Sequence, residues 1–155
     1  MGKWRIQAGV TREASGCNKG AAVDAYWAQG ILQGMPVLLD AFDEGGCIVV
    51  WNGECERVTG YSAAEIIGNH RALEMLYPEI EYRTVMLDEA KRRRFEEYSS
   101  VWELTAKDGT RKAVEWFNVG ARLVVPGWSE WSLGIVITER QRLEVALREA
   151  TIREQ

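Results

Sequence analysis

The residues with the most reactive side chains are few and widely spaced in this chain. It has one histidine, His70, and three cysteines, Cys17, Cys47 and Cys55, none of which forms the Cys-x-x-Cys spacing of a metal site or a redox pair. We find no Ser-His-Asp order, no His-Glu-x-x-His helix and no glycine-rich phosphate loop in the sequence. We therefore expect no catalytic residue, no metal site and no disulfide framework.

Composition and charge narrow the classes of partner. Hydrophobic residues make up 46% of the chain and charged residues 27%, with a net charge of −4 and no basic stripe of the kind that binds nucleic acid. No apolar run approaches the roughly 20 residues that cross a bilayer, and the N-terminus lacks a basic-then-apolar leader. We expect a cytoplasmic protein with no nucleic-acid partner and no direct membrane contact.

The first expected element is an amphipathic helix over residues 21–36, behind a flexible tail at residues 1–20. Its apolar stripe has the i, i+3, i+4, i+8 spacing of one helix face and consists of Val23, Tyr26, Trp27 and Ile31. A helix outside the domain proper has few places to bury an indole except the outer face of a sheet or a partner subunit. We therefore predict that this stripe forms part of a homodimer interface.

Short apolar runs separated by turn residues predict a five-stranded antiparallel sheet, so the fold class is α+β. The expected strands are 37–42, 47–51, 98–106, 113–125 and 131–138. Between the second and third strands the sequence favours helices: Ser62 and Glu65 have the spacing of a capping box, and a longer helix is expected from Pro78 towards Arg94.

The C-terminal residues 139–155 predict the start of a coiled-coil helix. Thr138 and Gln141 have capping-box spacing, and Leu143, Leu147 and Ala150 continue as a narrow apolar seam. The seam is too short to dimerise alone, so we expect the helix to lead into an output domain of the same parent chain, with Leu143 and Leu147 in a dimer interface.

One ordered stretch resembles a known family. Residues 51–62, Trp-Asn-Gly-Glu-Cys-Glu-Arg-Val-Thr-Gly-Tyr-Ser, followed by 65–68, resemble the signature of PAS domains. The turn at Lys107–Gly109 and the segment Ile137–Arg140 resemble two later landmarks of the same family, so the resemblance covers about residues 32–147, with a PAS core at 37–138. It implies a curved sheet with helices over one face, enclosing a pocket that holds haem, flavin, a small metabolite or nothing.

The resemblance also implies a function. It suggests a sensory and dimerisation module that binds a small molecule or cofactor and signals to an output domain such as a histidine kinase of a two-component system or a cyclic-dinucleotide enzyme. The pocket candidates are Met86, Trp116, Asn118 and Ile135. The candidates for signal transmission are Thr138, Glu139 and Arg140. Many members carry an aspartate where this chain has Val136, so the coupling here is either apolar or uses another acid such as Glu139. The alternative is an interaction domain whose core is filled by its own side chains.

The resemblance disfavours haem as a cofactor and leaves flavin open. Haem-binding members typically use a histidine on the long helix, and residues 79–94 contain none. Residues 69–74 distantly resemble the Asn-Cys-Arg-Phe-Leu-Gln box of light-sensing LOV domains, but His70 stands at the cysteine position, so no cysteinyl–flavin adduct can form there. Flavin bound without a covalent bond, with Asn118 at the ring edge, stays an alternative.

Overall fold

The computed structural model describes residues 18–153, with the backbone alone described at 18–25, 139, 140, 145 and 153. The predicted tail therefore lies outside the described residues, apart from its last three. Those three residues open the first helix, α1 (Asn18–Gly34), which begins earlier than residue 21.

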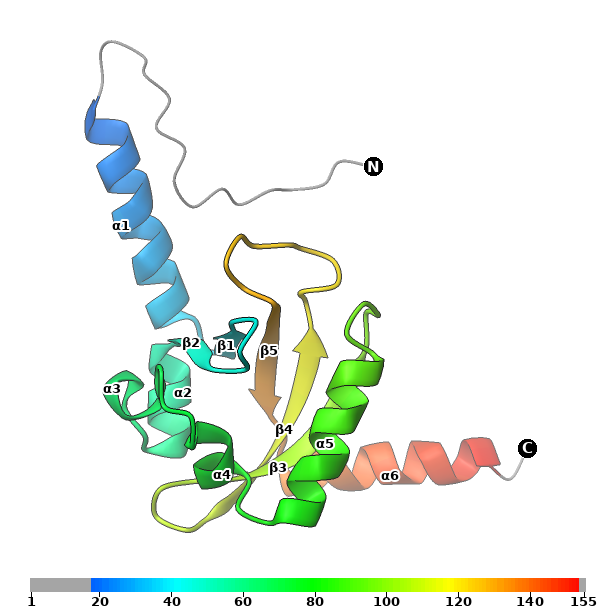
Figure 1. Ribbon diagram of the computed structural model, residues 1–155. Helices are drawn as coiled ribbons and strands as arrows, with labels where there is room; N and C mark the ends of the chain where they lie inside the picture. Colours follow the sequence, from blue (N-terminus) through cyan, green and yellow to red (C-terminus); the bar gives the residue numbers. More distant parts are fainter. Residues whose placement is uncertain (1–17, 154–155) are drawn as a thin grey trace.

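The remaining elements follow the predicted order of two strands, several helices, three strands and a helix. They are β1 (Leu38–Phe42), β2 (Ile48–Trp51), α2 (Gly53–Thr59), α3 (Ala63–Ile66), α4 (Ala72–Leu76), α5 (Ile80–Arg92), β3 (Ser99–Thr105), β4 (Arg111–Asn118), β5 (Glu130–Val136) and α6 (Glu139–Arg153). The strands form one antiparallel sheet in the order β2-β1-β5-β4-β3, which confirms the α+β prediction. Figure 1 shows α2 to α5 gathered beside the sheet, with α1 and α6 projecting from it in different directions. None of the described helices combines the length and the apolar character needed to cross a membrane.

The fourth strand is shorter than the sequence pattern suggested. β4 ends at Asn118, and the backbone N–H groups of Val119 and Gly120 both donate to the Trp131 carbonyl at 3.2 Å. Two donors on one carbonyl break the regular ladder, so the chain leaves the sheet before residue 125. Positive φ at Gly127 then turns the chain towards β5.

Asn52 holds the N-terminal half of the fold together. It is 0% exposed, and its side chain caps α2 by accepting from the Cys55 N–H at 3.2 Å. The same oxygen accepts from the Leu39 N–H at 3.0 Å, and the amide nitrogen donates to the Leu32 and Val37 carbonyls at 3.0 and 2.9 Å. One buried amide thereby links the end of α1, the start of β1 and the first turn of α2.

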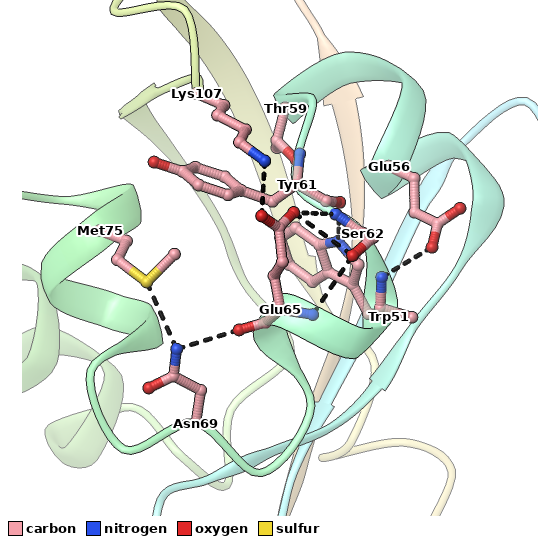
Figure 2. A network of polar contacts seen from close by, with 10 residues as sticks. Trp51, Glu56, Thr59, Tyr61, Ser62, Glu65, Asn69, Met75 and Lys107 are labelled. Atoms are coloured by element: carbon pink, nitrogen blue, oxygen red, sulfur yellow. Dashed lines mark hydrogen bonds and ion pairs between the residues drawn. The ribbon is translucent and has the colours of Figure 1, made fainter.

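A second polar network joins the segment 51–68 to the turn at Lys107–Gly109, two of the segments that resemble PAS domains (Figure 2). The predicted capping box is confirmed, because Glu65 N–H donates to Ser62 Oγ at 3.3 Å and Ser62 N–H donates to Glu65 Oε2 at 2.8 Å. Lys107, in the turn between β3 and β4, donates to the other oxygen of Glu65 at 2.5 Å. Asn69 donates to the Glu65 carbonyl at 2.9 Å. This network fixes α3 to the turn between β3 and β4.

The two faces of the sheet have different cores. The inner face packs against the helices, and its cluster includes Leu38, Ile48, Trp51, Leu104 and Val114. The outer face has a smaller cluster, Leu39, Ala41, Val125 and Trp131. A strand alternates its side chains between faces, and β1, β2 and β5 contribute to both clusters, whereas β3 and β4 contribute only to the inner one.

Candidate functional site

A cavity of about 570 Å³ lies between the inner face of the sheet and helices α4 and α5. Its size falls in the range of small-molecule sites in proteins, roughly 300–1,000 Å³. Much of its wall is aromatic: Phe42, Trp51, Tyr77, Tyr98, Trp102 and Trp116. The rings of Tyr82 and Trp102 meet edge to face at 5.6 Å, which fixes part of this wall. The inner face therefore has an open hollow beside its packed cluster.

The indole of Trp116 owes its position to Gly134. Trp116 on β4 lies opposite Gly134 on β5, and a Cβ atom on that glycine would stand 2.8 Å from two carbons of the indole. The missing side chain lets the ring lie over β5. Its N–H makes no hydrogen bond there but is close enough to the Tyr77 hydroxyl to lower the pKa of that group. Burial and the nearby charge of Asp40 act more strongly, so the pKa of Tyr77 is raised overall.

Asp40 places a carboxyl group at the cavity wall. It sits on the inner face of β1, opposite Ser132, and is 8% exposed. Burial raises the pKa of Asp40 to about 7, the charge of Glu130 adds to the rise, and a hydrogen bond from the Ser132 backbone opposes it. The sequence pattern did not single out this residue. The available signal was a carboxylate in the middle of the apolar run at 37–42.

The unpaired polar atoms of the protein gather at this cavity. Among the residues that the structure describes, three buried side-chain atoms have no hydrogen-bond partner: Asp40 Oδ1, Arg94 Nε and Trp116 Nε1. All three belong to residues that line the cavity. Buried polar groups are nearly always paired, so three exceptions in one place single out this cavity as the candidate site.

Three of the four predicted pocket residues line the cavity: Met86 on α5, and Trp116 and Asn118 on β4. The Asn118 amide nitrogen donates to the backbone carbonyls of Arg94 and Glu96 at 3.1 and 2.8 Å. It thus anchors the connection between α5 and β3 at the cavity rim.

Ile135 does not line the cavity, so that prediction was wrong. It pairs with Glu115 on the outer face of the sheet and is 45% exposed. The alternation along β5 was predicted correctly, but the apolar row turns away from the helices. The inward row is Ser132, Gly134 and Val136, and the absence of a side chain at Gly134 leaves room for the Trp116 ring.

Helix α6 begins where predicted, and its contact with the sheet comes from an unexpected residue. Gln141 N–H donates to Thr138 Oγ1 at 3.4 Å and Thr138 N–H donates to Gln141 Oε1 at 2.9 Å, as a capping box requires. The side chains of Glu139 and Arg140 lie outside the described residues. One turn further on, Arg142 forms an ion pair with Glu103 on β3. An acid on β3, Glu103, thus contacts the helix.

The predicted interface residues expose their side chains wherever these are described. On α1, Trp27 is 64% exposed, and Tyr26 and Ile31 are also exposed, whereas the Val23 side chain lies outside the described residues. On α6, Leu143 and Leu147 are exposed.

The cysteines stand apart from the cavity wall. Cys55 is buried in α2, with its thiol 3.4 Å from the Leu39 carbonyl, and burial raises its pKa far above the ordinary range. Cys47 Sγ lies 3.2 Å from His70 Nδ1 near the protein surface. Cys47 and Cys55 are the cysteines that the structure describes, and neither lines the cavity, so neither of these two thiols faces a ligand bound there.

The architecture agrees with a comparison against protein families. The model for the PAS fold matches residues 28–137. The chain belongs to the PAS family. The resemblance seen in the sequence is thereby confirmed, including the signature at residues 51–62.

Solved structures show the same PAS fold at low sequence identity. The PAS domain of a protein from Colwellia psychrerythraea is 20% identical with a TM-score of 0.57, and the match covers 75% of this chain and 98% of that one. The PAS domain of an HTR-like protein from Haloarcula marismortui is 19% identical with a TM-score of 0.54, covering 76% and 93%. At these identities the likeness shows the fold. A comparison with curated proteins gives no match.

One PAS neighbour was solved with a small molecule. The PAS domain of the quorum-sensing receptor RpfR from Cronobacter turicensis, in complex with BDSF, is 16% identical with a TM-score of 0.54; the match covers 67% of this chain and 96% of that one.

Proposed function

We propose that this PAS domain is a cytoplasmic sensory module that binds a small molecule in the cavity and passes the bound state to α6. The cavity of about 570 Å³, with its three unpaired polar atoms, carries the proposal. A domain whose core was filled by its own side chains, the alternative, would not leave a hollow of this size. The complex of the RpfR domain with BDSF supports the proposal, because it shows a domain of this fold bound to a ligand.

The route to α6 runs through β3. Trp102 and Leu104 line the cavity, and Glu103 between them faces the other way and pairs with Arg142 of α6. The Glu103 backbone N–H also donates to the Tyr82 hydroxyl of α5 at 2.8 Å. A ligand that displaces α5 or the Trp102 ring would therefore act on both contacts of Glu103. If the ligand binds the domain more tightly with α6 in one position than in the other by a few kcal/mol, that difference in binding free energy is enough to shift the helix between the two positions.

Filling the cavity should weaken the binding of a small apolar probe. Ala90 on α5 lines the cavity, so Ala90→Phe adds a ring to the hollow without removing a large contact. We expect indole, as the probe, to bind the parent protein and to bind this variant at least about tenfold more weakly, because the space is occupied. Calorimetry measures the affinity, and amide hydrogen exchange at 138–142 reports whether α6 responds.

The matched control for this variant is Ala64→Phe, which adds the same ring at an exposed position of α3. Equal indole affinity in the two variants would contradict uptake in the cavity. Unchanged exchange in α6 upon saturation would contradict the route through Glu103.

A second candidate role is self-association, because α1 exposes a run of large apolar side chains. We propose that Tyr26, Trp27 and Ile31 pack against a second copy, with Leu143 and Leu147 extending the contact along α6 towards an output domain of the parent chain. Trp27→Glu should then shift the protein from dimer to monomer in sedimentation at micromolar concentration, because a charge replaces an apolar anchor. Gln29→Glu is the control on the same helix, and an unchanged mass in both variants would refute the interface.

A further inference from the structure

The three unpaired atoms in the cavity define what a ligand must offer. Asp40 Oδ1 has no hydrogen-bond donor and Trp116 Nε1–H has no acceptor, whereas Arg94 Nε–H makes no hydrogen bond but is ion-paired with Glu130 at 3.7 Å. A carboxamide or lactam supplies this set, because it has an N–H donor beside a carbonyl oxygen with two lone pairs. We propose that the cavity recognises a small neutral molecule with an aromatic or aliphatic body and an amide-type head, whose N–H binds Asp40 and whose oxygen binds Trp116. This inference rests on the proposed function.

The charges around the cavity disfavour an anionic ligand. Four carboxyl groups line it, those of Asp40, Asp43, Glu44 and Glu130, against two cations, those of Lys91 and Arg94. One cation is already engaged, because Arg94 Nε lies 3.7 Å from a Glu130 oxygen. A phosphate or carboxylate brought into this wall would meet an excess of negative charge in a region of low dielectric. The same argument speaks against flavin nucleotides, which carry a phosphate.

A cationic amine matches the charge but not the hydrogen bonds. An ammonium group has donors only, so it would satisfy Asp40 and leave the Trp116 N–H without an acceptor. Leaving a buried donor unpaired costs about 1–3 kcal/mol. The apolar remainder of the ligand has a ready environment in the wall formed by Leu73, Leu76, Met86 and Leu104.

The protonation state of Asp40 gives the inference a pH signature. The titratable or charged groups around Asp40 lie on every element packed against it: Glu130 on β5, Tyr77 after α4, Cys55 on α2, Asp43 and Glu44 in the β1–β2 turn, Lys91 on α5, and Arg94 and Tyr98 between α5 and β3. Because the pKa of Asp40 is about 7, the carboxylate becomes the dominant form as the pH rises past that value. An ionised acceptor forms roughly twice as strong a hydrogen bond as a neutral one. Amide binding should therefore tighten as the pH rises from 6 to 8.

Three probes with one body and different heads test the inference. They are 3-phenylpropanamide, 3-phenylpropanoic acid and 3-phenylpropylamine, titrated calorimetrically at pH 6 and pH 8, with propylbenzene as the headless body. We expect the amide to bind tightest at pH 8 and to gain about threefold or more between the two pH values. In Asp40→Asn the pH dependence should vanish. In Trp116→Phe the amide should lose about fivefold in affinity, because one hydrogen bond is lost while the ring remains.

Each other outcome overturns the amide assignment. A preference for the acid or the amine, or a pH dependence that persists in Asp40→Asn, means that Asp40 and Trp116 do not bind the polar head of the ligand in the way that we propose. If propylbenzene binds as tightly as the amide, the cavity binds ligands but makes no favourable contact with the polar head. In these cases the sensory proposal survives. If propylbenzene, indole and all three probes fail to bind, both proposals fail.

Discussion

Asn52→Ala is expected to lower the free energy of unfolding by about 3–5 kcal/mol, enough to leave the domain at the edge of stability. The substitution removes four hydrogen bonds and leaves two backbone N–H groups and two carbonyls without their buried partner. Each buried group left unpaired costs about 1–3 kcal/mol, less what local relaxation or an entering water recovers. Urea denaturation followed by circular dichroism measures the change.

Asn69→Ala serves as the control, because Asn69 is also a helix-flanking asparagine with local hydrogen bonds but is only partly buried. We expect that variant to lose about 1 kcal/mol. If Asn52→Ala costs no more than the control, the carbonyls of Leu32 and Val37 find other partners, and Asn52 does not tie α1 to the domain.

Asp40→Asn should have the opposite effect and should depend on pH. The pKa of Asp40 is about 7 in the folded protein and 3.8 in an exposed chain. Between these values the unfolded chain loses the proton that the folded protein keeps, so stability falls as the pH rises from 4 to 7, and the full loss is present above 7. Asparagine cannot ionise. The ligand-free variant should therefore be more stable than the parent by about 2–4 kcal/mol at pH 8 and nearly equal to it at pH 4.

Urea denaturation of both proteins at pH 4, 6 and 8 measures this difference. Asp88→Asn, at an exposed position of α5, is the control, with changes within about 0.5 kcal/mol expected at each pH. A parent protein that gains stability between pH 4 and 8 relative to Asp40→Asn would show that Asp40 is paired in the folded protein and unavailable to a ligand.

Local patterns predicted most of the fold because each element carries its own signals. The capping boxes at Ser62 and Thr138 and the turn glycines Gly46 and Gly109 act within a few residues, so they can be recognised without knowledge of the tertiary structure. The alternation along β5 was also local, and the structure retains it.

The parts that could not be predicted depend on contacts between distant segments. Alternation shows that Ile135 and Gly134 face opposite ways but not which of them faces the helices, because that choice depends on how α5 packs. Similarly, the pairing of Glu103 with Arg142 joins residues 39 positions apart. The role of Asp40 as an unpaired carboxyl became visible only with Trp116 and Arg94 placed around the same cavity.

The position of Trp116 over Gly134 also gives the protein an optical reporter. The emission of an indole depends on the polarity around it and on what its N–H binds, and this ring lies in the cavity wall with an N–H that makes no hydrogen bond in the ligand-free protein. A phenyl-bearing ligand does not emit in the same range. Once the other tryptophans are replaced, fluorescence from this single side chain can follow the arrival and departure of a ligand in real time, with no label attached to either molecule.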